Sequence, residues 1–244
     1  MGQVSNLSGQ VGNLSHGAPP MTNIDKALDY VADGMAIGLG SGRAAERFIR
    51  ALAASRRHVR CVATSSATAS LATSLGLSVT TLDDLSHLDL TVDGADEVDP
   101  QLNLIKGYGR ALVREKIVAT ASRHRIILIG PDGVSEKLVP VLGTRGKLPV
   151  EVLRFGLAVV RGKLEEMGIP STPVTRDDGE FFFSDNGNVI LTCKVGPIVD
   201  PVELERKITA IPGVVGTGLF LGMVDAVLIQ NGEELEVRQK PVVG

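Results

Sequence analysis

The chain has 244 residues, of which 43% are hydrophobic, so it can form one large domain or a large and a small one. Its net charge of −3 argues against general nucleic-acid binding, and it lacks the run of about 18 apolar residues that would predict a membrane span. Cys61, Cys193 and four scattered histidines do not have metal-ligand spacing, which predicts reduced thiols and no metal site.

Residues 1–21 are rich in Ser, Gly and Asn. They lack the apolar core of a secretory signal, so we predict a disordered tail and a cytoplasmic protein. An amphipathic helix is predicted at 22–33, where Gly34 ends it, and a short apolar strand follows at 35–39.

A glycine-rich turn, GSGRAAERFI, then leads into a second helix. Such a turn can present backbone N–H groups to an anion, with help from the helix dipole. The spacing matches neither a dinucleotide fingerprint nor a P-loop. The turn therefore indicates either an anion site or simply a tight connection.

The same strand–turn–helix unit repeats along the first half of the chain. Its expected parts are strands at 58–63, 77–82, 88–92 and 125–130, a hydroxyl-rich turn at 64–68, and helices ending at Leu75 and spanning 111–122. Strands that alternate with helices predict an α/β fold with a doubly wound, mostly parallel, Rossmann-like sheet.

Residues 93–115 carry the ionisable groups that suggest chemistry. Asp93 and Asp96 follow the strand at 88–92, at the sheet edge where such folds bind ligands, and Lys106 lies in a glycine-punctuated turn. Glu115 falls one turn into the next helix, on an otherwise apolar face, which is typical of a general base with a raised pKa. The alternative is structural: DG forms turns, aspartates cap helices, and Lys–Glu pairs often lie on the surface.

From Leu148 the pattern changes to that of a small α+β domain at 149–220. Its expected parts are a helix at 151–167, a hairpin around SDNG, a helix from Pro201 and a strand at 213–220. Two final strands, VDAVLIQ and ELEVRQ, should return to the main sheet. The larger domain would then comprise residues 22–148 and 221–244.

These motifs resemble the ribose-5-phosphate isomerase family of the A type over residues 24–240. The resemblance rests on GLGSGRAAERFI, TSSAT, VDGADEVDP, KGYGRALVREKI, KLPVEVL, SDNGNVILT and IPGVVGTGLF. It implies interconversion of D-ribose 5-phosphate and D-ribulose 5-phosphate, without metal or organic cofactor. It also implies that Glu115 moves a proton between C2 and C1 through a cis-enediolate. Asp93, Asp96 and Lys106 would assist ring opening and stabilise the enediolate oxygens.

The resemblance further implies the residues that bind the phosphosugar substrate. These are Gly40, Ser41, Gly42, Arg43, Ala44, Gly94, Ala95, Gly107, Tyr108, Gly109 and Lys137. Arg43 and Ala44 replace two hydroxyls that the family usually offers to the phosphate, and Tyr108 and Arg110 interrupt a turn that is usually all glycine. We therefore expect Arg43 or Arg110 to supply phosphate charge, because a guanidinium can bond two phosphate oxygens.

The sequence is also compatible with two other functions. The altered phosphate turn leaves open an isomerase for a different phosphosugar, and the same fold also occurs as a non-enzymatic sugar-phosphate sensor. The resemblance implies a homodimer or homotetramer, with 149–220 as the contact region.

Overall fold

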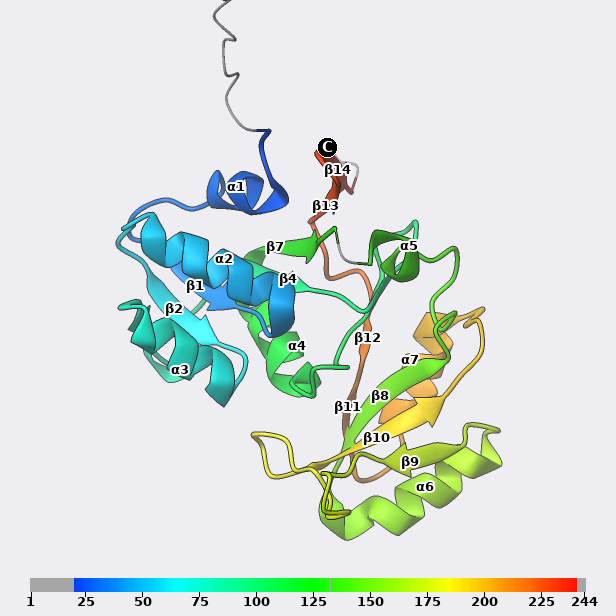
Figure 1. The fold of residues 1–244 in the computed structure, drawn as a ribbon. Coiled ribbons are helices and arrows are strands. Elements are labelled where there is room, and N and C mark those ends of the chain that lie inside the picture. Colours follow the sequence, from blue (N-terminus) through cyan, green and yellow to red (C-terminus); the bar gives the residue numbers. More distant parts are fainter. Residues whose placement is uncertain (1–19, 132, 241–244) are drawn as a thin grey trace, which may run out of the picture.

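The computed structural model describes residues 20–131 and 133–240, so most of the predicted tail, residues 1–19, lies outside it. In this part of the chain, seven strands form the main sheet in the order β14-β13-β7-β4-β1-β2-β3 (Figure 1). Every neighbouring pair is parallel except β13 with β14. The strands are β1 Ala36–Leu39, β2 Arg60–Ala63, β3 Ser78–Val79, β4 Leu88–Gly94, β7 Ser122–Ile129, β13 Ala226–Asn231 and β14 Glu234–Gln239.

Helices cover both faces of this sheet. On one face, α1 (Asn23–Leu28), α2 (Gly42–Ala54) and α3 (Ser66–Ser74) share an apolar core with the strands. On the other face, α4 (Leu112–Ala121) packs Val118 against the sheet. The predicted doubly wound α/β fold is confirmed.

The strand order changes direction between β1 and β4. From β1 the chain runs outward through β2 and β3, whereas from β4 it runs the other way to β7. Ligands of such folds bind outside the carboxyl ends of the strands at this switch point. The ends of β1 and β4, at Leu39 and Gly94, therefore mark the expected site.

A second, antiparallel sheet has the order β11-β8-β10-β9 and lies beneath the main sheet in Figure 1. Its strands are β8 Lys147–Val152, β9 Ser171–Pro173, β10 Val189–Lys194 and β11 Val214–Thr217. Helices α6 (Leu157–Glu166) and α7 (Pro201–Thr209) bury Leu164 and Ile208 against it. The domain boundaries at 148 and 221 stay a prediction.

Three short strands connect the two sheets. They are β5 Glu97–Val98, β6 Leu104–Ile105 and β12 Leu219–Phe220, in the order β12-β6-β5. The remaining short helix, α5 (Val134–Lys137), lies near them. None of the helices in residues 20–131 and 133–240 combines the length and apolar character needed to cross a membrane.

Several predicted elements are wrong in extent or in kind. The helix expected at 151–167 begins only at Leu157, because Pro149 to Val152 pair with β10 and β11 as strand β8. The helix at 22–33 ends at Leu28, and the strand at 77–82 shrinks to β3. The first arm of the SDNG hairpin makes only isolated bridges, including Phe183 with Val189.

Candidate active site

Asp93 lies directly behind the site, where β1 and β4 end side by side. Its Oδ1 accepts hydrogen bonds from the backbone N–H groups of Ser41 (3.1 Å) and Gly94 (2.7 Å). A Cβ at Gly40 would lie 2.2 Å from the Asp93 carboxyl carbon, so only glycine allows this approach. The two strand ends thus fix the orientation of a buried carboxylate.

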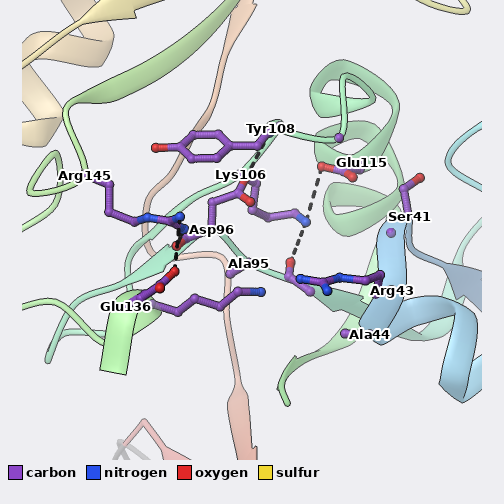
Figure 2. Close-up of a pocket in the computed structure, with 15 residues that line it drawn as sticks. Ser41, Arg43, Ala44, Ala95, Asp96, Lys106, Tyr108, Glu115, Glu136 and Arg145 are labelled. Atoms are coloured by element: carbon purple, nitrogen blue, oxygen red, sulfur yellow. Dashed lines mark hydrogen bonds and ion pairs between the residues drawn. The ribbon is translucent and has the colours of Figure 1, made fainter. Parts of the chain in front are cut away.

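Lys106 lies at the centre of the site, directly after β6. Its Nζ is 3.0 Å from Asp93 Oδ2 and donates a hydrogen bond of 2.6 Å to the carbonyl oxygen of Gly94. The same Nζ is 3.3 Å from Glu115 Oε2 (Figure 2). The ring of Phe220 lies behind it, 5.5 Å from Nζ to the ring centroid. The Lys106 side chain is 5% exposed and both carboxylates are 3% exposed. This is a dry cluster of one cation and two acids.

Glu115 is the least satisfied member of this cluster. Burial raises its pKa to about 7, although the positive charge of Lys106 lowers it, and the negative charge of Asp93 raises it further. Within the described residues its Oε2 has no hydrogen-bond partner, since the contact with Lys106 is an ion pair without hydrogen-bond alignment. Glu115 therefore combines a carboxylate more basic than usual with a free lone pair.

Lys106 stays charged under the same conditions. Burial alone would lower the pKa of Lys106, but the charges of Asp93 and Glu115 outweigh burial and raise it above the ordinary lysine value. A permanent ammonium next to a basic carboxylate can move a proton and offset the negative charge that this creates.

A cavity of about 260 Å³ opens above this cluster. Asp96 lines it, and its carboxylate accepts a hydrogen bond of 2.9 Å from the backbone N–H of Tyr108. Burial raises the pKa of Asp96 and lowers the pKa of Lys137, so both groups carry their charge less readily than in water.

The structure brings nearly all of the predicted site residues to this cavity. Its lining includes Ser41, Gly42, Arg43, Ala44, Gly94, Ala95, Asp96, Lys106, Gly107, Tyr108, Gly109, Glu115 and Lys137. Gly40 and Asp93 lie behind the wall rather than in it. Arg110 is directed elsewhere, because its guanidinium stacks 4.5 Å from the centroid of the Phe182 ring. Of the two arginines expected to meet a phosphate, only Arg43 is in place.

Two lining residues were missed from the sequence, Glu136 and Arg145. Arg145 donates a hydrogen bond of 3.1 Å to the carbonyl oxygen of Asp96 and lies 5.4 Å from the centroid of the Tyr108 ring. It also pairs with Glu136 at 3.6 Å (Figure 2). Arg145 lies in the short turn before β8, which only the tertiary fold brings to the cavity. Glu136 lies in α5, directly before the predicted Lys137.

One end of the cavity is suited to an anion. Helix α2 begins at Gly42, and its N-cap residue Ser41 makes no capping hydrogen bond, because its Oγ lies 2.7 Å from Thr64 Oγ1 instead. The first-turn N–H groups of α2 therefore lack a side-chain cap at the cavity wall. Figure 2 shows the Arg43 side chain extending from this helix end toward the cavity. Within residues 20–131 and 133–240, no group of three or more His, Cys, Asp or Glu side chains is arranged to hold a metal ion.

Fold and site together define an α/β enzyme that moves a proton on a small anionic substrate. The chain belongs to the ribose 5-phosphate isomerase A (phosphoriboisomerase A) family, whose model matches residues 60–234. It is 46% identical over 231 residues to the ribose-5-phosphate isomerase A of Bradyrhizobium diazoefficiens, covering 88% of this chain and 94% of the relative. This confirms the family predicted from the motifs.

Solved structures agree with this assignment. Ribose 5-phosphate isomerase A of Methanocaldococcus jannaschii has a TM-score of 0.83 and 36% identity, covering 90% of this chain and 97% of that one. A D-ribose-5-phosphate isomerase in complex with phospho-erythronic acid has a TM-score of 0.84 and 31% identity, covering 89% and 96%.

Proposed function

We propose that this protein interconverts D-ribose 5-phosphate and D-ribulose 5-phosphate, with Glu115 as the general base. The observation that carries the proposal is the contact of 3.3 Å between the Lys106 ammonium and a buried Glu115 carboxylate whose pKa is raised to about 7. A base works best when its pKa lies near the working pH, and a neighbouring cation stabilises an oxyanion as it forms.

When the reaction runs from the aldose to the ketose, Glu115 removes the proton from C2 of the open-chain sugar. The electron pair forms the C1–C2 double bond of a cis-enediolate, and the carbonyl oxygen on C1 takes the negative charge. Lys106 offsets this charge. A proton moves from the C2 hydroxyl to the C1 oxygen, Glu115 returns its proton to C1, and the carbonyl is now at C2. Asp96, whose pKa burial raises, is suited to carry protons between the oxygens and to assist ring opening.

The phosphate is proposed to bind at the opposite end, at the start of α2. Arg43 and Lys137 both line the cavity there, and the uncapped helix terminus adds backbone donors. The guanidinium of Arg43 replaces hydroxyls that the family usually provides. Because this substitution changes how the phosphate is held, a different aldose phosphate is the second candidate substrate. Comparing kcat/KM across four-, five- and six-carbon aldose phosphates distinguishes the two.

Glu115→Gln tests the proposal directly, because it keeps the side-chain shape and removes the base. We expect kcat with ribose 5-phosphate to fall at least about 100-fold, with the thermal unfolding transition retained. Glu165→Gln, on the exposed side of α6, is the matched control and should keep full activity. A Glu115→Gln enzyme with the wild-type kcat would refute the assignment.

A homodimer or homotetramer in contact through residues 149–220 and a cytoplasmic location belong to the same proposal. Phe155, Val159 and Val202 are exposed apolar side chains in that region, which favours a buried contact in the assembled protein. Light scattering of the purified protein would measure the assembly.

A further inference from the structure

The turn at residues 184–188 joins the smaller sheet to the helices around the cavity. It precedes β10 and closes on itself, since the Ser184 N–H donates to the Asn188 carbonyl oxygen (2.9 Å) and the Gly187 N–H to the Ser184 carbonyl oxygen (2.8 Å). In Figure 1 it projects from the start of β10 toward α3 and α4. The turn is not among the residues that line the cavity.

Glu151 of β8 fixes the shape of this turn from below. It is fully buried, and its Oε1 accepts hydrogen bonds from Ser184 Oγ (2.9 Å), Asn186 Nδ2 (3.0 Å) and Asn188 Nδ2 (2.9 Å). Within the described residues Glu151 Oε2 has no hydrogen-bond partner, so the three bonds to Oε1 stabilise this buried carboxylate and their loss would leave it unsatisfied. The turn is therefore a rigid platform, although it lies on the surface.

The platform contacts α4 through Arg114, the residue directly before Glu115. Arg114 Nε donates to Asn186 Oδ1 (2.8 Å), Nη2 donates to the Asp185 carbonyl oxygen (2.6 Å), and Nη1 lies 3.6 Å from Asp185 Oδ2. Helix α4 has no side-chain cap at its N-cap residue, Ala111. The guanidinium of Arg114 thus anchors the first turn of α4, whose N-terminus has no side-chain cap.

The same carboxylate reaches α3, on the other side of the cavity. Asp185 Oδ2 accepts a hydrogen bond of 2.6 Å from the backbone N–H of Ser66, the first residue of α3. The preceding residue, Ser65, accepts a hydrogen bond of 3.2 Å from the Oγ of Ser41, which lines the cavity. Asp185 therefore links the helix that carries Glu115 with the turn that supports Ser41.

We infer that Asp185 is a positioning residue for the isomerisation, and that the smaller sheet sets the distance between the base and the phosphate end through it. The inference rests on the proposed function. A proton moved between C2 and C1 requires a base held to within about 1 Å, and misplacement by that amount can reduce the rate about 100-fold. The side chains of Arg114 and Asp185 are 36% and 35% exposed, so solvent weakens the attraction between their charges. The pair therefore acts by fixing the position of α4 more than by its charge attraction.

Separate substitutions test the contact of the turn with α4 and its contact with α3. Arg114→Met frees α4 and should lower kcat with ribose 5-phosphate about 10- to 100-fold, with KM within twofold of wild type. Ser66→Pro removes the N–H that donates to Asp185, together with an exposed hydroxyl, at a first helical position that tolerates proline. The extended backbone of Ser65 also suits a following proline. This variant should raise KM and leave kcat within twofold.

Asp185→Ala removes the Ser66 hydrogen bond and the 3.6 Å ion pair, but it keeps the hydrogen bonds from Arg114 to the Asp185 carbonyl oxygen and to Asn186. It should therefore raise KM as Ser66→Pro does and lower kcat less than Arg114→Met. Combining it with Arg114→Met should lower kcat no further than Arg114→Met alone, because Arg114→Met already removes the ion pair. Asp178→Ala is the matched control: it cuts another ion pair of 3.6 Å, with Arg176, in a distant exposed turn of the same region. The inference is overturned if kcat and KM of Asp185→Ala equal those of Asp178→Ala, or if its activity loss only follows the unfolded fraction. A wild-type protein inactive on ribose 5-phosphate would instead refute the proposed function.

Discussion

Replacing Glu115 with glutamine should alter the pH dependence of stability as well as the activity. Burial raises the pKa of Glu115 to about 7 in the folded protein, against an ordinary value of 4.5. The unfolded chain therefore releases this proton at lower pH than the folded one. Wild-type stability consequently falls as the pH rises from about 4.5 through about 7, because folding then buries a charge.

The size of this effect follows from the two pKa values. A difference of roughly 2.5, at about 1.4 kcal/mol per unit, corresponds to about 3 kcal/mol in the free energy of unfolding. Most of it, about 2 to 3 kcal/mol, falls between pH 5 and 8.5. Glutamine cannot ionise, so Glu115→Gln should gain this much stability relative to wild type across that range. The loss of activity would thus accompany a gain in stability at alkaline pH.

Urea unfolding of both proteins at a series of pH values and equal concentration measures the difference. Glu203→Gln is the control: a side-chain hydrogen bond from Arg206 lowers the pKa of the exposed Glu203 to about 2. Its contribution to stability is lost only as the pH falls below about 4.5, so its difference from wild type should be flat from pH 5 to 8.5. A flat curve for Glu115→Gln as well would refute the raised pKa.

Two further predictions concern catalysis. kcat/KM for ribose 5-phosphate should rise with pH with an apparent pKa near 7, because Glu115 must lose its proton to act as the base. A profile that is flat from pH 5.5 to 8.5 would contradict this prediction. Arg43→Ala should raise KM at least about tenfold while kcat stays within about threefold, because it removes phosphate charge and not the base. Arg50→Ala is the control, because it removes a surface ion pair with Glu46 on the same helix and should leave KM unchanged. An equal KM in both variants would contradict phosphate binding by Arg43.

The main sheet was predictable because its strands carry local signals. Each inner strand is a short apolar run that ends at a glycine or a hydroxyl-rich turn, as at Gly40 and Thr64. The parallel order then brings the ends of β1 and β4 together without further information. The proximity of Lys106 and Glu115 follows from the same topology, and the structure places them 3.3 Å apart.

The remaining features depend on contacts that the sequence does not reveal. Val150 and Val152 fit a helix or a strand equally well by periodicity, and only pairing with β10 decides for the strand. Arg145 belongs to the cavity because Glu97, buried and distant in sequence, accepts hydrogen bonds from the backbone N–H groups of Gly143 (2.6 Å) and Arg145 (3.0 Å). No local spacing predicts that turn.

Strand β13 lies between β7 and β14, although the whole smaller sheet separates it from β7 in the sequence. Until residues 226–231 pair with it, β7 is an open edge that could pair with other chains. Helix α1 also depends on β13. The Asn23 N–H donates a hydrogen bond to Gln230 Oε1 (2.8 Å), and the Asn23 side-chain amide donates one to the Leu228 carbonyl oxygen (3.3 Å). Helix α1 is thus fastened by a strand that lies far from it in the sequence, and we expect a variant truncated after residue 224 to stay exposed to chaperones and proteases.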